Sequence, residues 1–319
     1  MSKNRIQSFI CATIIILTAC TVVVDDNDAE QSLQFIAEYD MTDLDMDYRF
    51  NGPQARGELE NRQIDEASGL AVSRSFPGNI WTHNDSGDHN RIFLVGHDGS
   101  DAATFRIRNT GNRDWEDMAI GPGPEEGAYY LYVADIGDNR AQYDIKTVYR
   151  FKEPMPGDVD QDVAVQWIDG EDAIRFRYPD GMKDAETLMI DPFTKDLYIV
   201  TKREFPVTVY LARYPQPLDD VFELEKLGTL PFTGATAGDI SADGLLITIK
   251  TKERVFNWTR EPHETVSQAF ERKPVQLPYT PEVQGEAIAW NKDGSGYFTL
   301  SEAKGGIIPI LYFYGLDSL

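Results

Sequence analysis

The chain has 319 residues, of which 53 are acidic and 30 are basic, and its formal net charge is −23. Proteins that bind nucleic acid through its phosphates present a basic face, so this balance excludes DNA and RNA as expected partners. The acidic excess suits a solvated surface or affinity for divalent cations. The sequence also lacks the Gly-x-Ser-x-Gly, His-Glu-x-x-His and phosphate-binding glycine motifs, which leaves no support for those classes of catalysis.

Residues 1–19 have the pattern of a secretory signal. Lys3 and Arg5 precede a short apolar run, which ends in Leu17-Thr18-Ala19-Cys20. A charged start, a short apolar stretch and small residues before a cleavage point are typical of a signal peptide, and the run is too short to span a bilayer. Leu-Thr-Ala-Cys resembles the bacterial lipobox, which predicts a lipid on Cys20. The alternative is an ordinary cleaved signal with a chance cysteine.

The lipobox predicts an exported protein that is anchored in the cell envelope through the lipid. Thr21 in place of Asp implies the outer membrane, if sorting is of the enterobacterial type. Residues 20–32 are acidic with little to bury, so we expect a flexible tether there. The only other cysteine, Cys11, leaves with the signal, so residues 33–319 must be held by their own core without a disulfide. We expect them to form one monomeric domain.

A short phrase recurs along residues 33–319 at intervals of about 50 residues, with one longer interval of about 70. The recurring acidic positions of the five copies are Glu66, Glu116, Glu186, Asp239 and Glu286, and the second copy also contains Asp117. Two segments rich in aromatic and β-branched residues follow each phrase, as strands prefer, and turn signals such as Asp98-Gly99 separate them. Repeats of this length and content predict the blades of a β-propeller.

The expected strands can be placed by residue number. The second strands are 79–82, 130–133, 197–200, 245–248 and 296–299; the third are 91–94, 147–150, 207–210, 255–258 and 310–313; outer strands are 103–106, 174–177 and 274–277. The last blade lacks room for an outer strand, so the segment around 57–59 is expected to close the ring. The count predicts an all-β, five-bladed propeller with four-stranded antiparallel blades. The long interval and residues 33–60 leave room for a sixth blade.

The inner strand of each blade lines the axis, so the acidic residues of the phrase are expected to meet at one mouth. Like charges in a small space raise each other's pKa or require a counter-ion. Ca²⁺ takes six to eight oxygen ligands, so the candidate metal ligands are Glu66, Glu116, Glu186, Asp239 and Glu286, with Asp65, Asp114, Asp117 and Asp184 close behind. The alternative is that some carboxylates accept backbone hydrogen bonds and only fix the blade geometry.

The ends of the second strands predict a ligand-binding rim around the same mouth. Its expected members are Asp85, Asp135, Lys202, Lys250 and Glu302. Two lysines among carboxylates suit an anionic or polar ligand bridged by a cation, and ion pairs that join the blades are the alternative. Among the histidines, only His83 lies in this region, as a general base, a ligand or a structural hydrogen-bonding group.

Four stretches carry a family resemblance: Glu66-Ala-Ser-Gly-Leu-Ala71, Trp81-Thr-His-Asn-Asp-Ser-Gly-Asp88, Asp114-Trp-Glu-Asp-Met-Ala119 and Tyr132-Val-Ala-Asp-Ile-Gly-Asp-Asn139. They resemble a group of exported bacterial β-propeller proteins and, more distantly, the gluconolactonase-like and phytase-like calcium propellers. The lactonase-like resemblance implies that Glu66 is a metal ligand, but that family's Asn ligand and catalytic Asp have no counterpart here. The phytase-like resemblance implies phosphoester hydrolysis near clustered Ca²⁺.

Two functions follow from these observations. The first is an envelope-anchored lipoprotein that binds a small molecule or a protein partner at a central, Ca²⁺-supported acidic site. The second is a Ca²⁺-dependent hydrolase of phosphoesters or lactones, in which the metal activates water and a free carboxylate acts as base. The sequence favours binding, because the acidic residues have no recognisable catalytic partner.

Overall fold

The computed structural model describes residues 33–160 and 162–317. The predicted signal peptide, the lipidation site Cys20 and the tether 20–32 lie outside the described residues. Within these residues the regular elements are strands, apart from the short helix α1 (Val266–Phe270) and the 3-10 turn η1 (Pro156–Asp158). No helix in this part of the chain is long and apolar enough to span a bilayer.

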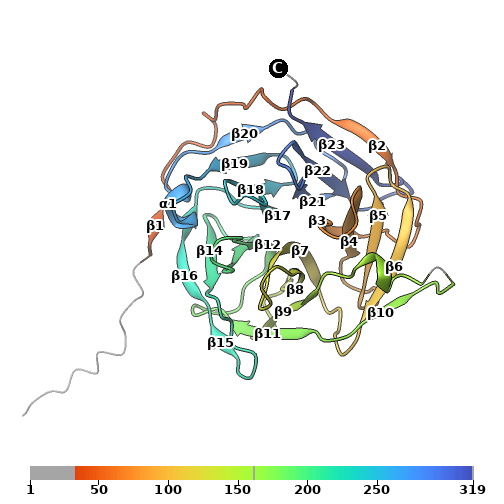
Figure 1. Ribbon diagram of the computed structural model, residues 1–319. Coiled ribbons are helices and arrows are strands. Elements are labelled where there is room, and N and C mark those ends of the chain that lie inside the picture. Colours follow the sequence, from red (N-terminus) through yellow and green to blue (C-terminus); the bar gives the residue numbers. More distant parts are fainter. Residues whose placement is uncertain (1–32, 161, 318–319) are drawn as a thin grey trace, which may run out of the picture. The chain divides into compact units, whose positions relative to one another are not determined.

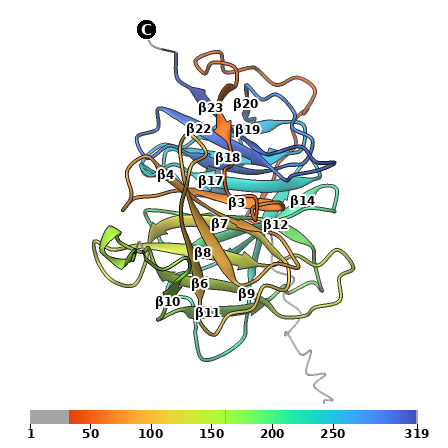
Figure 2. The same cartoon turned by 90° about the vertical axis from the view of Figure 1, so that its right-hand side faces the viewer.

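The strands form five sheets that surround a common centre (Figure 1). We number these blades 1 to 5 by their innermost strands, which are β3 (Ala67–Val72), β7 (Trp115–Pro122), β12 (Ala185–Ile190), β17 (Ala235–Ile240) and β21 (Gly285–Trp290). Strands β3, β7, β12 and β17 lie in the middle of the molecule in both views (Figures 1 and 2). Sheets arranged radially in this way define a five-bladed β-propeller, which confirms the predicted fold.

Each blade continues outward from its inner strand as an antiparallel meander. The second strands are β4 (Asn79–Asn84), β8 (Tyr129–Asp135), β13 (Leu197–Thr201), β18 (Leu246–Thr251) and β22 (Gly296–Ser301). The third strands are β5 (Arg91–Gly96), β9 (Lys146–Lys152), β14 (Val207–Ala212), β19 (Val255–Thr259) and β23 (Ile310–Gly315). All ten overlap the expected segments, because their β-branched and aromatic residues stand between clear turn signals.

The outer strands show how the ring closes. They are β6 (Asp101–Ile107), β11 (Asp172–Arg177), β16 (Glu225–Leu230), β20 (Val275–Leu277) and, in blade 5, β2 (Gln54–Glu58). Strand β2 comes from the start of the domain and pairs antiparallel with β23, as expected. A Cβ on Gly57 would lie 1.8 Å from the carbonyl oxygen of Asp98 in blade 1, so the closing strand needs glycine at this point.

The segments that left room for a sixth blade, the long interval between two repeats and residues 33–60, form no sixth blade among the described residues. Additional edge strands are present instead. Strand β10 (Gln166–Ile168) pairs parallel with β6, β15 (Phe222–Glu223) with β11, and β1 (Phe35–Ile36) with β16. Blades 1, 2 and 3 therefore have five strands each, one more than predicted. These strands cover outer edges whose unpaired backbone groups would otherwise be available for aggregation.

The core lies between the blades. The buried apolar side chains form five clusters, each shared by two neighbouring blades. Trp81 and Trp115 belong to the cluster between blades 1 and 2, and Trp290 and Tyr297 to the cluster between blades 4 and 5. Burial of one large side chain contributes roughly 1.5–3 kcal/mol, so packing between blades holds the ring together without a disulfide.

Candidate functional site: an acidic cluster at one mouth of the propeller

Each inner strand has a break in register close to its start. The breaks lie between Ala67 and Leu70, Trp115 and Asp117, Ala185 and Thr187, Ala235 and Ala237, and Gly285 and Ala287. A β-bulge of this kind re-aims the side chain of the additional residue and is common beside functional sites. The first bulged residue of each blade is therefore equivalent to the others, and these are Ser68, Glu116, Glu186, Thr236 and Glu286.

Two of the five predicted ligand positions lie outside the bulge. Glu66 lies two residues before Ser68, outside β3, and is exposed. Asp239 lies three residues after Thr236, is buried, and accepts a hydrogen bond from the backbone nitrogen of Trp290 (2.8 Å). The expectation of one acidic residue at the same position in all five blades is wrong for blades 1 and 4.

Five carboxylates nevertheless meet in the centre. Oxygens of Asp85, Asp114 and Glu116 lie within 4.8 Å of one another, and so do oxygens of Glu116, Asp184 and Glu186. We call these five residues the central acidic cluster. Asp85 follows β4, Asp114 and Asp184 precede β7 and β12, and the two glutamates are the bulged residues. Blades 1, 2 and 3 thus contribute to one cluster, and Glu116 belongs to both groups of three.

Burial and mutual repulsion favour the protonated forms of these groups. Burial raises the pKa of Asp85 to about 7. The pKa of Glu116 is raised well above its usual value by burial and then by the charges of Glu186, Asp85 and Asp114. Burial likewise raises the pKa of Glu186, although Lys202 opposes this shift, and burial raises the pKa of Asp114. Full ionisation of the cluster at neutral pH therefore requires added positive charge.

The protein supplies only part of that charge. Lys202 forms an ion pair with Oε2 of Glu186, and Arg203 lies 2.5 Å from Oδ2 of Asp184. No described residue donates a hydrogen bond to the Glu116 carboxylate or forms an ion pair with it, although only 4% of Glu116 is exposed. Glu116 is thus a largely buried residue whose carboxylate forms no direct hydrogen bond or ion pair with a described residue, and it belongs to both groups of three.

The acidic region extends around the mouth beyond the cluster. Glu286 of blade 5 forms an ion pair with Lys252 of blade 4 (2.7 Å), and its charge helps to raise the pKa of Glu186. Glu302 of blade 5 acts on Asp85 and Glu66 of blade 1 in the same way. These interactions connect all five blades at the face where the inner strands begin.

Three of the five predicted rim residues occupy equivalent positions. The backbone nitrogens of Asp85, Lys202 and Glu302 donate to the carbonyl oxygens of Glu66 (2.8 Å), Asp184 (3.0 Å) and Gln284 (2.9 Å), each of which precedes an inner strand. In blade 4 the residue at this place is Lys252, which directly follows β18. The sequence prediction named Lys250 instead.

The other two predicted rim residues point elsewhere. Lys250 is fully buried, and its Nζ donates to the carbonyl oxygens of Gly285 and Thr251. It pairs with Ala237 inside the sheet and therefore lies below the rim. Asp135 is buried in the last pair of β8, where its side chain accepts from the backbone nitrogen of Asp114 (3.0 Å). It positions a member of the cluster without belonging to it.

His83 lies behind the site. Its ring is fully buried, makes an edge contact with Trp115 at 5.6 Å between centroids, and places Nδ1 2.9 Å from the carbonyl oxygen of Asn84. A Cβ on Gly69 would lie 2.6 Å from its Nε2, so glycine makes room for the ring. Burial lowers the pKa of His83 to about 4. The structural hydrogen-bonding alternative therefore describes its position.

Asp117 shows what a carboxylate next to the bulge does when it serves only the fold. Its Oδ1 accepts from the backbone nitrogen of Met118 (2.9 Å), and its Oδ2 accepts from those of Leu188 (2.9 Å) and Gly238 (3.2 Å). Asp117 is fully buried and ties blade 2 to blades 3 and 4 near the axis. The alternative in which carboxylates fix blade geometry thus applies to Asp117, and to Asp239 through Trp290.

The donor set of the central acidic cluster fits a hard divalent cation. It offers only carboxylate oxygens, which suit Ca²⁺ and related ions, and contains no sulfur or imidazole ligand. The unpartnered carboxylate of Glu116 is the group that a cation would satisfy. Oxygens within 4.8 Å of one another can share a single ion, since Ca²⁺–oxygen distances are roughly 2.3–2.6 Å.

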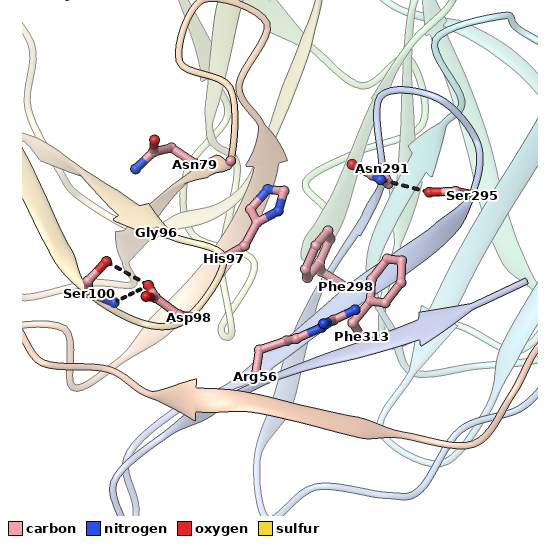
Figure 3. A pocket seen from close by; sticks show the side chains of 11 residues that line it. Arg56, Asn79, Gly96, His97, Asp98, Ser100, Asn291, Ser295, Phe298 and Phe313 are labelled. Atoms are coloured by element: carbon pink, nitrogen blue, oxygen red, sulfur yellow. Dashed lines mark hydrogen bonds between the residues drawn. The ribbon is translucent and has the colours of Figure 1, made fainter.

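The largest of the described cavities lies away from this cluster. It has a volume of about 720 Å³ and is open to solvent at the opposite ends of the strands, between blades 1 and 5 (Figure 3). Arg56 lies over the ring of Phe313 there, and His97 packs against Phe298 at 4.6 Å between centroids. The acidic cluster and this cavity are therefore separate features.

Comparison with known proteins adds likeness of fold only. No family model and no curated protein matches the chain. Among solved structures, a PQQ-bound aldose sugar dehydrogenase from Streptomyces coelicolor is 11% identical, with 83% of this chain and 97% of that chain covered and a TM-score of 0.43. The WD40 repeats of RRP9 are 10% identical (78% and 79% covered, TM-score 0.39), and U3-55K is 12% identical (78% and 68% covered, TM-score 0.37).

Proposed function

We propose that this propeller is a binding protein of the cell envelope that holds a divalent cation, Ca²⁺ first, at the central acidic cluster. The observation that carries the proposal is Glu116, whose buried carboxylate has no partner among the described residues and lies within 4.8 Å of carboxylates from two other blades. A buried charge without a partner is costly. A bound cation removes that cost and the repulsion between the carboxylates together.

The surroundings of the mouth support a ligand or partner that contacts the cation from outside. Several large apolar side chains are exposed in loops that follow a second strand or precede an inner strand, and these are Tyr143, Met182, Phe205, Val283 and Ile307. Loops at these places lie on the face of the acidic mouth. The ligand would meet an acidic, cation-bearing centre, a rim with Lys202 and Lys252, and apolar groups further out.

Binding is favoured over hydrolysis by the pairing of the lysines. A phosphoester hydrolase needs cationic groups that are free to contact the substrate, whereas Lys202 pairs with Glu186 and Lys252 with Glu286. The hydrolase is therefore the second candidate. It would use a cation-bound water as nucleophile and Glu302, which lies outside the central acidic cluster, as the base.

The cellular placement rests on the N-terminal sequence. We propose that residues 1–19 direct export and that a lipid on Cys20 anchors a monomeric propeller, with the outer membrane as its destination. Metabolic labelling with an alkyne fatty acid tests this step. The label is expected on the wild-type protein and not on Cys20→Ser. An unlabelled wild-type chain that is released in soluble form would identify an ordinary cleaved signal.

Thermal unfolding in Ca²⁺ and in EGTA tests the cation. A ligand that binds only the folded state stabilises it by about 2.7 kcal/mol at 100 times its Kd. The wild type and the surface control Glu253→Gln are expected to melt several degrees higher in Ca²⁺, and Glu116→Gln is expected not to respond. A wild-type melting temperature that does not change in millimolar Ca²⁺ would contradict the proposal.

A further inference from the structure

A second, smaller cavity lies in blade 5 and is lined mostly by apolar side chains. Its volume is about 260 Å³, and its walls come from β23, the loop after β22 and the segment before β21. The apolar walls include Val283, Ile307, Ile308, Ile310 and Tyr312. It differs from the central acidic cluster in both its lining residues and its chemistry.

The carboxylate of Glu282 has unused hydrogen-bonding capacity at this cavity. Glu282 lines the cavity, and one of its carboxylate oxygens accepts a hydrogen bond from the hydroxyl of Thr299. Its other oxygen, Oε2, is buried and has no hydrogen-bond partner among the described residues. A buried carboxylate oxygen without a donor costs free energy that a ligand can recover by donating to it.

None of the polar side chains around it donates a hydrogen bond to that oxygen. Tyr314 accepts from the backbone nitrogen of Thr280 (3.2 Å) and Tyr279 from that of Glu282 (3.4 Å). Lys250 directs its ammonium group to the carbonyl oxygens of Gly285 and Thr251. Burial raises the pKa of Glu282 and the charge of Lys250 opposes this shift, but no described ion pair or hydrogen bond joins the two side chains. Oε2 is therefore a carboxylate oxygen without a donor at a cavity whose walls are mostly apolar and also include the hydroxyl groups of Ser301 and Tyr312.

We propose that this cavity binds a small, mainly apolar molecule whose single hydrogen-bond donor, an amine or a hydroxyl group, donates to Oε2 of Glu282. A dry cavity of about 150 Å³ accommodates benzene, so about 260 Å³ suits a ligand of roughly ten non-hydrogen atoms. Apolar walls with one placed polar group are the usual composition of a small-molecule site. The donor fixes the orientation of the ligand, and the walls supply most of its affinity.

Calorimetric titration of the full-length protein with three probes of similar size tests this inference. The probes are 2-phenylethylamine, 2-phenylethanol and ethylbenzene, of which only the first two carry a donor. The amine and the alcohol are expected to bind at least ten times more tightly than ethylbenzene. If no probe binds up to about 10 mM, or if ethylbenzene binds equally well, the inference is wrong.

Three variants identify the site. Glu282→Gln keeps the size of the side chain and is expected to weaken the amine at least tenfold while its effect on ethylbenzene stays small. Ile307→Ser, in an exposed loop where misfolding is not expected, should weaken all three probes alike. Glu253→Gln, an exposed acidic residue outside the cavity, should change nothing. Unchanged amine binding in both Glu282→Gln and Ile307→Ser would place any binding elsewhere and overturn the inference.

Discussion

Glu116 and Glu186 occupy the same bulged position of two neighbouring inner strands, and their carboxylate oxygens lie within 4.8 Å of each other. Lys202 forms a direct ion pair with Glu186, whereas its charge acts on Glu116 without an ion pair. Because of this asymmetry, we expect the ionisation of Glu116 to depend more than that of Glu186 on whether a cation is bound at the central acidic cluster. The four predictions that follow, and the final measurement, test this site and the fold that builds it.

Glu116→Gln is expected to stabilise the cation-free protein. The substitution removes a carboxylate whose ionisation is opposed by burial and by the charges of Glu186, Asp85 and Asp114. Urea unfolding in EGTA at pH 8 should show a free energy of unfolding above that of the wild type. A less stable variant under these conditions would show that Glu116 has a partner within the protein.

Without a cation, stability is expected to fall as the pH rises from about 5 to about 8. The pKa of both Asp85 and Asp239 is raised to about 7 in the folded protein, against about 3.9 in an unfolded chain. Over this range the folded state retains protons that the unfolded state has released. The stability that these bound protons contribute is therefore lost as the pH rises through the pKa values of the folded state. Saturating Ca²⁺ displaces protons from the cluster and should reduce the slope. Urea unfolding across this range measures both slopes, and a rise in EGTA would contradict the account.

Asp117→Asn is expected to destabilise the propeller without a change of shape. Both carboxylate oxygens of Asp117 accept backbone hydrogen bonds. Asparagine keeps one of these oxygens and replaces the other with an NH₂ group, which cannot accept a hydrogen bond. A buried donor left without its acceptor costs about 1–3 kcal/mol. Urea unfolding should show a loss of this size, or about twice as much if both Leu188 and Gly238 lose their acceptor. Wild-type stability would exclude Asp117 as a tie between blades.

Arg260 and Asp191 form a buried, two-point ion pair between blades 4 and 3, with distances of 2.9 Å at both contacts. Removal of one partner leaves the other charge buried, which costs about 3–5 kcal/mol. Arg260→Met should therefore lower the free energy of unfolding by this amount. The exposed pair Arg62 and Glu58 is the matched control, and Arg62→Met should change stability by less than about 1 kcal/mol. Equal effects at the two sites would refute the structural role of the buried pair.

The blades could be predicted from the sequence because each strand carries its own local signal. Strand-forming residues between turn signals placed the second and third strands, and the missing outer strand of the last blade predicted closure by the segment around Gly57. Strands β1, β10 and β15 gave no such signal. They are two or three residues long and exist because another blade offers an edge.

The predicted metal ligands lie in the central acidic cluster only where the bulge register followed the sequence pattern. Glu116 and Glu186 stand at the bulge, whereas Glu66 and Asp239 resemble them in sequence but lie outside it. Lys250 and Lys252 differ by two residues and therefore point to the same side of an ideal strand, yet one is buried and the other reaches the rim at the strand end. Register and depth are set by pairing with neighbouring strands, which the local sequence does not encode.

Calorimetric titration of the purified protein with Ca²⁺ is the most direct test of the central claim, because it measures binding and stoichiometry together. The account predicts one strongly bound ion per chain in the wild type, loss of that ion in Glu116→Gln, and its retention in Glu66→Gln, since Glu66 lies outside the central acidic cluster. No binding to the wild type at millimolar Ca²⁺, or an ion lost in Glu66→Gln but kept in Glu116→Gln, would contradict it.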